Sequence, residues 1–399
     1  MCDDNVHPNS HTFVSLFKSC ERLHELELGK QLHSFACQEG IDCNAFVEFS
    51  ILNMYAECGA LEDANMLFGW MPNLTLLSWN TMLSSFVTHG QQEKALQLYM
   101  QMEGNDGVEP NHHTFVILFK GCSRMSSLEY GEKMHGYARM KGFTSDPVVG
   151  SALISMYGNF REIVKAEDVF GALTEHDVAS WNGMISTYIK GGHSEKALCL
   201  YMQMRKEGVN PSQWTFLHVV QACAGYANQE VSFVGGHSAV LIAFEIARAL
   251  HVDALRMGFL SDPFFSSALM SVYGKCGAIV ESEQVCSMLS QPDIVSWNAM
   301  LSAYVECGQA HKALCLFTQI LKEGRNPDPQ TFVIVLHALM LATEDSSFPA
   351  RQHSMDLCLE IGQALHIDAD VKGFAIDAFV GSTLLRMYGR LNAIAEAEN

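Results

Sequence analysis

The sequence predicts an all-α fold, a right-handed α-solenoid superhelix built from helix-turn-helix repeats. The string Ser-Trp-Asn occurs three times, beginning at Ser78, Ser180 and Ser296. Between these strings, apolar residues recur at helical spacing, and glycines separate them into pairs of short segments. One such pair cannot bury its apolar face alone, so stacked neighbours must share a core, as in helical-repeat proteins.

The repeating unit is a triplet of blocks. Trp79 and Trp181 are 102 residues apart, and Trp181 and Trp297 are 116 residues apart. Between them recur a block that opens with Thr-Phe and a block that contains Met-Tyr or Val-Tyr. The three kinds of block are about 35, 35 and 31 residues long. In chain order the blocks span residues 10–44, 45–75, 76–111, 112–146, 147–177, 178–212, 213–262, 263–293, 294–328, 329–377 and 378–399, about eleven repeats with a truncated last one.

The block at 178–212 illustrates why each block is expected to form two helices. Apolar residues such as Met184 and Tyr188 lie at helical spacing, and the glycine pair that ends at Gly192 stops this segment. Ser194 is predicted to cap the second helix, whose apolar stripe follows. The same pattern runs through the chain, so we expect one continuous solenoid over 1–399.

Two blocks depart from the standard length. Extra residues occur near 231–243 and 342–356, between the two expected helices of the third and fourth Thr-Phe blocks. We expect loop insertions at the edge of the solenoid, with residues 239–249 able to extend the following helix. A cut between Asp177 and Val178, at a block boundary, should leave two folded halves because solenoid contacts are mostly between neighbours.

The composition limits the classes of function. With 48% hydrophobic and 17% charged residues the chain can fold, but its formal net charge is −19. Nucleic-acid binders gain affinity from Lys and Arg that neutralise phosphates. Any contact with RNA must therefore rely on base edges and on a locally basic stripe.

No targeting or membrane segment is apparent. No apolar run reaches the roughly 18 residues of a membrane helix, and residues 1–10 resemble neither a signal peptide nor an Arg-rich transit peptide. None of the 13 cysteines forms a Cys-x-x-Cys pair, and several recur at equivalent block positions. We therefore interpret them as reduced, small apolar packing residues.

The sequence contains no convincing catalytic or metal site. His193-Ser194-Glu195 matches the start of a zinc-deaminase signature, but the Pro-Cys-x-x-Cys that would complete the zinc site does not follow. A helix start is the better interpretation. One histidine recurs in each Thr-Phe block, too far apart in the chain to share a metal, and packing histidines are expected. These four residues are His33, His135, His251 and His366. We expect no enzyme activity, no catalytic residue, no metal and no cofactor.

The tryptophans of the Ser-Trp-Asn strings have two interpretations. Trp79, Trp181 and Trp297 could stack on nucleic-acid bases, or they could pack between helices. Each precedes an Asn that is a candidate for contacts on another face of the helix, so the two side chains cannot point the same way. Packing is therefore the favoured interpretation.

The motifs resemble those of the PLS subfamily of plant-type pentatricopeptide repeat (PPR) proteins. Ser-Trp-Asn is typical of its P motifs, Leu-Glu-Leu-Gly-Lys-Gln-Leu-His at 26–33 of its L motifs, and Met-Tyr-Ala-Glu-Cys-Gly at 54–59 of its S motifs. The resemblance covers residues 10–399, and no deaminase domain is visible after the repeats. It implies a sequence-selective binder of single-stranded RNA in mitochondrial or chloroplast RNA processing, as a specificity factor for RNA editing or modification. A separate deaminase or another editing-complex protein would be its partner, and no membrane is involved.

The resemblance also implies which residues read bases. In the family, the fifth residue of a motif and its last residue together select one base, through the exposed edge of an unpaired nucleotide. The pairs are Asn80 with Asn111, Ser151 with Asp177, Asn182 with Ser212, Ser267 with Asp293, and Asn298 with Asp328. They imply the base order pyrimidine, unread, G, C, unread, G, U from residue 76 to 328. Apolar fifth residues, which cannot read a base, occur at Val14, Phe49, Val116, Leu217 and Val333.

Two alternatives stay open at this point. The polar residues of these pairs could simply cap helices or form turns. The whole chain could instead be a protein–protein interaction scaffold, which the acidic composition and the apolar fifth residues favour. The distribution of Lys and Arg separates the two functions, because RNA binding requires a basic surface within the acidic shell.

Overall fold

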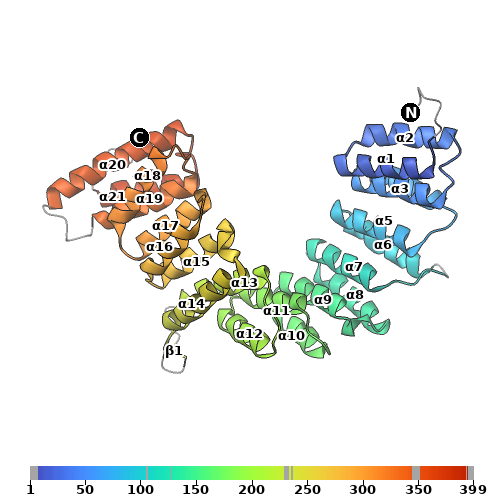
Figure 1. Cartoon of the computed structure of the whole chain (residues 1–399), viewed down its shortest axis with the longest axis horizontal. Helices are drawn as coiled ribbons and strands as arrows, with labels where there is room; N and C mark the ends of the chain where they lie inside the picture. Colours follow the sequence, from blue (N-terminus) through green and yellow to red (C-terminus); the bar gives the residue numbers. More distant parts are fainter. Residues whose placement is uncertain are drawn as a thin grey trace. The chain divides into compact units, whose positions relative to one another are not determined.

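The computed structural model describes residues 8–104, 107–125, 127–228, 233–234, 237–343, 351–391 and 393. The all-α prediction is confirmed: the chain folds as a helix-turn-helix solenoid (Figure 1). The only strands among these residues are the two-residue β1 (Phe233–Val234) and β2 (His237–Ser238), which pair antiparallel. The helices fall into two compact units, residues 1–191 and 192–399.

The first unit contains six first helices and five second helices. The first helix of each block begins where the block begins. The pairs are α1 (Ser10–Leu23) and α2 (Leu26–Gln38), α3 (Ala45–Glu57) and α4 (Leu61–Trp70), α5 (Leu76–Thr88) and α6 (Gln92–Glu103), α7 (His112–Met125) and α8 (Leu128–Met140), α9 (Pro147–Asn159) and α10 (Ile163–Ala172), followed by α11 (Val178–Lys190). A 3₁₀ turn, η2 (Phe143–Ser145), precedes α9.

The second unit continues the same pattern from the second helix of block 178–212. Its helices are α12 (Ser194–Lys206), α13 (Gln213–Ala227), α14 (Ala239–Met257), α15 (Pro263–Lys275), α16 (Ile279–Met288), α17 (Ile294–Glu306), α18 (Ala310–Lys322), α19 (Pro329–Ala342), α20 (Arg351–Val371) and α21 (Ala378–Arg390). The 3₁₀ turn η3 (Phe259–Ser261) precedes α15. No helix among the described residues is both long and apolar enough to cross a membrane.

The last residue of a block caps the first helix of the next block. Asp177, for example, accepts the backbone N–H of Ser180 at 2.7 Å, and Asp328 accepts that of Thr331 at 2.8 Å. Such caps satisfy the free N–H groups of a helix start and stabilise it by about 1 kcal/mol. The second helices that follow the turn glycines lack a side-chain cap, and this includes α12. The prediction that Ser194 caps α12 is wrong, because His193 is the N-cap residue and Ser194 is the first residue of the helix, with its side chain buried.

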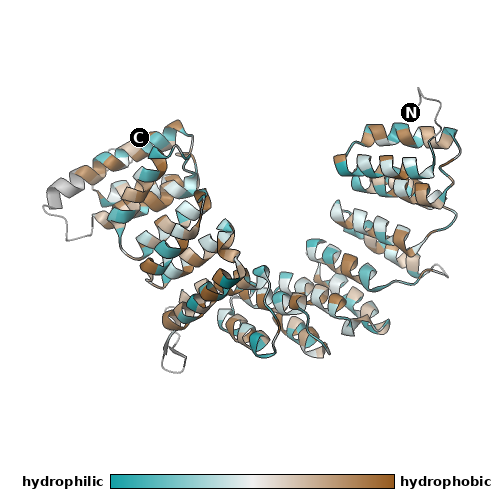
Figure 2. Ribbon diagram, in the orientation of Figure 1, coloured by the Kyte–Doolittle hydropathy of each residue, from teal (hydrophilic) through white to brown (hydrophobic). Residues whose placement is uncertain are grey.

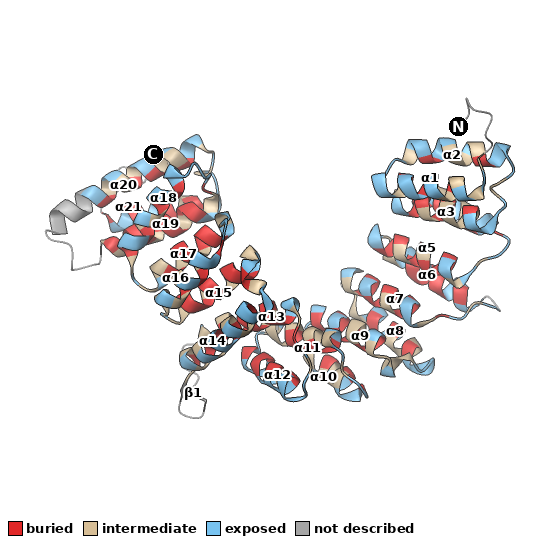
Figure 3. Ribbon diagram, in the orientation of Figure 1, coloured by how far each residue is buried: buried red, intermediate tan, exposed pale blue. Residues whose placement is uncertain are grey.

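Within each unit the first helices pack against one another in sequence, and the second helices cover one side of this row. The buried residues therefore lie on the faces between helices (Figure 3). Hydrophobic and hydrophilic residues alternate along single helices rather than forming wholly apolar segments (Figure 2). Each first helix thus retains one face for contacts outside the core.

The predicted packing of the repeated histidines is confirmed. In every L block the imidazole Nδ1 lies within hydrogen-bonding distance of the Tyr hydroxyl of the following Met-Tyr or Val-Tyr pair. The distances are 2.9 Å for His33–Tyr55, 2.8 Å for His135–Tyr157, 3.0 Å for His251–Tyr273 and 3.0 Å for His366–Tyr388. These pairs join each L block to the next S block.

The second helices that follow the two insertions are longer than their counterparts. The standard L-block second helices α2 and α8 have 13 residues, whereas α14 has 19 and α20 has 21. In α14, Ala239, Ala243 and Ala247 continue the buried stripe toward the N-terminus, so the helix extends through them. The extension of this helix is confirmed, and the loop predicted to reach residue 243 is shorter. Residues 231–232, 235–236 and 344–350 of the predicted insertions lie outside the described residues.

Candidate nucleic-acid interface

Three side chains form a hydrogen-bonded cluster where P block 294–328 meets the following L block. Asn298 Nδ2 on α17 lies 3.0 Å from Asp328 Oδ1 and 3.2 Å from Oδ2, and it donates to this carboxylate. The Thr331 hydroxyl lies 2.8 Å from Asn298 Oδ1 and 2.8 Å from Asp328 Oδ1. Because Thr331 is fully buried and Asn298 is 4% exposed, the cluster holds both predicted base-reading side chains in one orientation.

The same cluster recurs at the P block that ends at Asn111. Asn80 on α5 donates from Nδ2 to Asn111 Oδ1 over 3.5 Å, a long hydrogen bond. The Thr114 hydroxyl lies 2.8 Å from Asn80 Oδ1 and 3.1 Å from Asn111 Oδ1. Two of the predicted pairs are therefore brought into direct contact, in both cases with a buried threonine as the third member.

Ser267 and Asp293 are linked through a third residue. The Ser267 hydroxyl donates to the Pro263 carbonyl at 2.6 Å and lies 3.2 Å from the Ser296 hydroxyl. Ser296 in turn donates to Asp293 Oδ1 at 2.8 Å. Ser296 is the first residue of the Ser-Trp-Asn string and occupies the position that Thr331 occupies in an L block.

Of the remaining predicted residues, Ser151 and Asp177 have separate partners. The Ser151 hydroxyl donates to the Val148 carbonyl at 2.9 Å within α9, and Asp177 caps α11. Asn182 lies on α11 in the first unit, and Ser212 caps α13 in the second. The cap interpretation therefore holds for the last residue of each predicted pair, Asn111 included, and capping does not prevent a side chain from facing the surface.

A groove runs across the first helices of the second unit and contains several of the predicted residues. It has a volume of about 280 Å³, and its lining includes Ser267, Asn298 and Asp328 together with the apolar fifth residue Leu217. These residues come from α13, α15, α17 and α19. No Lys or Arg lines this groove, so recognition there depends on hydrogen bonds to bases rather than on phosphate contacts.

A second groove crosses α5, α7, α9 and α11 of the first unit and is basic. It has a volume of about 720 Å³, and Lys120, Arg124 and Ser151 line it. The Arg124 guanidinium donates to the carbonyls of Val87 and Thr88, at 3.2 Å each. These two hydrogen bonds hold Arg124 at the C-terminal end of α5, where a positive charge is favourable. Arg124 lines the same groove as Ser151, a predicted base-reading residue.

Basic residues are enriched in the row of first helices. Within the eleven first helices given above, eight Lys and Arg residues accompany four Asp and Glu residues, whereas the whole chain has 25 and 44. The acidic excess therefore lies in the second helices and connections. The basic residues of the first helices are Lys18, Arg22, Lys120, Arg124, Lys190, Lys275, Arg386 and Arg390.

The tryptophans of the Ser-Trp-Asn strings pack inside the solenoid, as predicted. Trp181 is fully buried, and its ring centroid lies 5.1 Å from that of Phe170. Trp79 is 3% exposed and meets Phe68 edge to face at 4.9 Å. They are therefore not available to stack on bases.

Sequence reasoning missed the buried hydroxyl residue that joins three of the five predicted pairs. Thr114, Thr331 and Ser296 follow the capping residue by three positions, where the hydroxyl reaches both the cap and the preceding first helix. A Thr or Ser stands at the third position of every block of the L and P kinds, whereas the S blocks have Val47, Val149, Phe265 and Val380 there. The role of this hydroxyl depends on the distance between stacked helices, which the sequence does not state.

Comparison with known proteins agrees with this architecture. The PPR repeat family matches residues 74–124, 176–225 and 292–340. Pentatricopeptide repeat-containing protein At5g27110 of Arabidopsis thaliana is 30% identical over 390 residues, which cover 98% of this chain and 52% of that protein. At4g14850 of the same organism is 32% identical over 84% of this chain and 47% of its own length. The chain thus spans about half the length of the curated relatives it matches.

A solved structure shows the same fold. The crystal structure of the pentatricopeptide repeat protein PPR10 in complex with an 18-nt psaJ RNA element matches with a TM-score of 0.72 at 17% identity. The match covers all of this chain and 55% of PPR10. The structure of PPR10 from maize matches with a TM-score of 0.59.

Proposed function

The chain belongs to the pentatricopeptide repeat proteins, and on this premise we propose that it binds single-stranded RNA along the row of its first helices. The observation that carries the proposal is the Asn298–Asp328–Thr331 cluster, repeated as Asn80–Asn111–Thr114. It presents an amide and an acceptor together at a block junction, where an unpaired base edge can meet them.

The charge distribution supports RNA over a protein scaffold. A strand of phosphates requires cations near its path, and the first helices are net basic in an otherwise acidic chain. Lys120 and Arg124 line the groove that also contains Ser151. A scaffold for acidic or neutral partners would not require this separation of charge.

The finer function that we propose is addressing in organellar RNA processing, as an RNA-editing or RNA-modification specificity factor. Relatives named as chloroplastic and as mitochondrial proteins support an organellar location. A separate deaminase or another editing-complex protein would supply the chemistry. We also propose that the eleven blocks form one continuous solenoid, because the sequence pattern continues through block 178–212.

Quantitative filter binding at fixed salt tests the base-reading assignment. The RNA carries the order pyrimidine, any base, G, C, any base, G, U, and a second RNA differs only at the final U. Asn298→Ala should weaken binding to the matched RNA by roughly tenfold to a hundredfold, on the scale of 1–3 kcal/mol for a good base contact. Binding to the altered RNA should change far less.

Asn65→Ala is the matched control, because Asn65 is an exposed asparagine on the second helix α4. It should leave both affinities unchanged. Equal weakening of both RNAs by Asn298→Ala would show that Asn298 is structural and that the base assignment is wrong. If neither RNA binds, the scaffold function replaces the proposal.

A further inference from the structure

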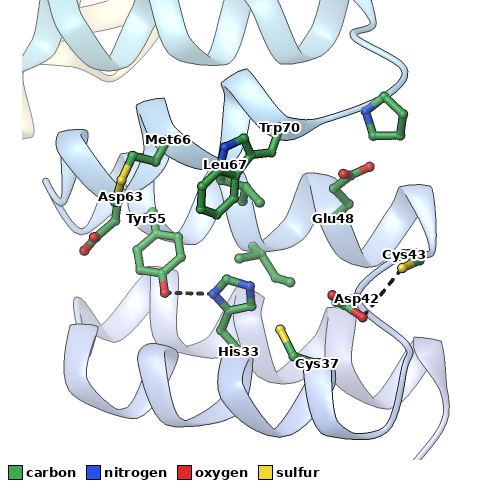
Figure 4. A pocket seen from close by; sticks show the side chains of 12 residues that line it. His33, Cys37, Asp42, Cys43, Glu48, Tyr55, Asp63, Met66, Leu67 and Trp70 are labelled. Atoms are coloured by element: carbon green, nitrogen blue, oxygen red, sulfur yellow. Dashed lines mark hydrogen bonds between the residues drawn. The ribbon is translucent and has the colours of Figure 1, made fainter.

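A pocket of about 450 Å³ lies on the opposite side of the helix row, between α2 and α4 and backed by α3 (Figure 4). His33 and Cys37 come from α2, Tyr55 from α3 and Trp70 from α4. Figure 4 shows the Trp70 ring and the His33 ring on either side of the opening. None of the predicted base-reading residues lines it.

The pocket holds negative charge that the fold does not neutralise. Asp42, Glu48 and Asp63 line it. Lys30 pairs with Asp63 at 3.1 Å, but neither Asp42 nor Glu48 forms an ion pair with any residue the structure describes. Burial, together with the negative charge of Asp42, raises the pKa of the Glu48 carboxyl. An incoming cation would relieve this repulsion.

Burial also lowers the pKa of His33, which hydrogen bonds Tyr55 at 2.9 Å. Burial therefore favours the neutral imidazole, which does not balance the carboxylates. Asp42 accepts a weak hydrogen bond from the Cys43 thiol, over 3.8 Å, and the Cys37 thiol is also near its carboxylate. Both free carboxylates thus keep acceptor capacity for a ligand.

The internal repeats show that this pocket is peculiar to the first L–S junction. Glu48 has small counterparts in the other three copies, Gly150, Ser266 and Gly381. At the second junction the Leu173 side chain packs so closely on Gly150 that even a Cβ would not fit there. The counterparts of Asp42 are Thr144, Leu260 and Ala375.

The rim of the pocket is apolar and exposed. Trp70 is 79% exposed and Met66 is 53% exposed, while the counterparts of Trp70 in the next two copies are Ala172 and Met288. An exposed indole beside carboxylates suits a guanidinium or ammonium group, which gains from both ring and charge. The apolar rim extends beyond what a small amine would cover, so the complementary ligand is a peptide.

We propose that this pocket binds an arginine or lysine side chain of a protein partner, with Asp42 and Glu48 accepting its hydrogen bonds and with apolar flanking residues of the partner on Trp70 and Met66. The pocket would recruit a basic segment without competing for the RNA face. The proposal does not depend on the proposed RNA binding.

Fluorescence anisotropy of the full chain with two labelled peptides tests it. One peptide carries a single arginine between two leucines, and the other carries neutral citrulline in place of the arginine. The arginine peptide should bind about tenfold more tightly, equivalent to 1.4 kcal/mol. Glu48→Gln, which keeps the volume and removes the charge, should reduce that preference by about fivefold.

Glu27→Gln is the control, because Glu27 is an exposed carboxylate on the neighbouring helix α2 and does not line the pocket. It should leave the preference unchanged, and the melting curves of both variants should match that of the parent chain. Equal affinity for the two peptides, or an unchanged preference in Glu48→Gln, would overturn the proposal. Displacement of the peptide by an equal concentration of spermidine would reassign the pocket to small amines, and displacement by RNA would place the peptide on the first helices.

Discussion

At the scale of single residues, the block junctions depend on a buried hydroxyl that touches no solvent. The Thr331 hydroxyl lies within hydrogen-bonding distance of both Asn298 Oδ1 and Asp328 Oδ1, and Asp328 caps the backbone N–H of Thr331. A side chain in this place sets the orientation of the Asn298 amide without being able to contact a ligand. It is therefore a positioning residue.

Thr331→Val tests that role, because valine keeps the shape and removes the hydroxyl. Asn298 Oδ1 then loses a buried donor, which costs about 1–3 kcal/mol of stability. Discrimination between the matched RNA and the RNA altered at the final U should fall by roughly tenfold. Filter binding with both RNAs measures it, and Thr331→Ser, which restores the hydroxyl, should recover most of the discrimination. Loss of stability with unchanged discrimination would limit Thr331 to a structural role.

The His135–Tyr157 pair makes stability depend on pH. Burial, with the positive charge of Arg139 adding to it, lowers the pKa of His135, so the fold favours neutral imidazole. The unfolded chain takes up the proton first, near pH 6.5. This contribution is therefore complete above pH 6.5 and is lost as the pH falls through the lower value of the folded state.

His135→Gln removes this titration, since glutamine can still hydrogen bond Tyr157 but cannot gain a proton. The parent chain should lose more free energy of unfolding between pH 7.5 and pH 5.5 than the variant does. Urea midpoints at the two pH values measure the difference. Because Glu48 and Glu306 have raised pKa values that act in the opposite direction, only the comparison of parent and variant is informative. Parallel losses in the two proteins would contradict the assignment.

At the scale of elements, the L and S blocks meet through one very close contact. Gly131 on α8 packs against Met156 on α9, where a Cβ would lie 2.7 Å from the methionine sulfur. Gly29 with Met54 and Gly362 with Met387 make the same contact. The third junction has Ala247 in place of glycine, and there Val272 replaces methionine. Where the L-block residue is the larger alanine, the S-block residue is the smaller valine, and where it is glycine, the S-block residue is methionine.

Gly131→Ala should therefore destabilise the first unit although alanine favours helix. The expected cost is about 1–3 kcal/mol, the usual range for overpacking a core. Adding Met156→Val, which copies the third junction, should recover part of the loss. Urea unfolding of the two single variants and the double variant forms a double-mutant cycle. Strictly additive effects would show that the pairing of sizes has no energetic basis.

The helices could be predicted from the sequence because the residues that start and end a helix lie within or next to it. Helix starts follow from capping residues such as Asp177 and Asp328, and helix ends from turn glycines, so block starts and first-helix starts agree. The capping role predicted for Ser194 was wrong because its small side chain is buried near Gly225 of the next block. Capping rules consider only the helix itself and do not include such a contact. The link between Ser267 and Asp293 through Ser296 was missed for the same reason, since it joins residues of two stacked blocks.

At the scale of the whole molecule, the boundary between compact units does not follow a block boundary. It falls between Gly191 and Gly192, so α11 belongs with the helices that precede it. Trp181 explains this placement, because the ring is fully buried against Phe170 of α10. A cut at 177/178 would remove that ring from the first unit.

A fragment ending at residue 191 should accordingly be more stable than one ending at residue 177. The difference should be about 3–5 kcal/mol, the range for removing a buried tryptophan from a core. Urea unfolding followed by circular dichroism compares the two fragments, and Trp181→Ala in the longer fragment should reproduce most of the loss. Equal free energies of unfolding for the two fragments would contradict this prediction, because residues 178–191 would then contribute nothing to the stability of the first unit.

The exchange of Gly131–Met156 for Ala247–Val272 has a consequence for engineered chimeras. A designer who shuffles blocks as cassettes would join an L block of one kind to an S block of the other. Ala247 followed by methionine would collide, while Gly131 followed by valine would leave a void, and either error costs stability. The unit to transfer is therefore the L–S pair rather than the single block, with the cuts placed within the P blocks on either side. Each transferred pair then keeps its own size-matched contact between the L and S helices.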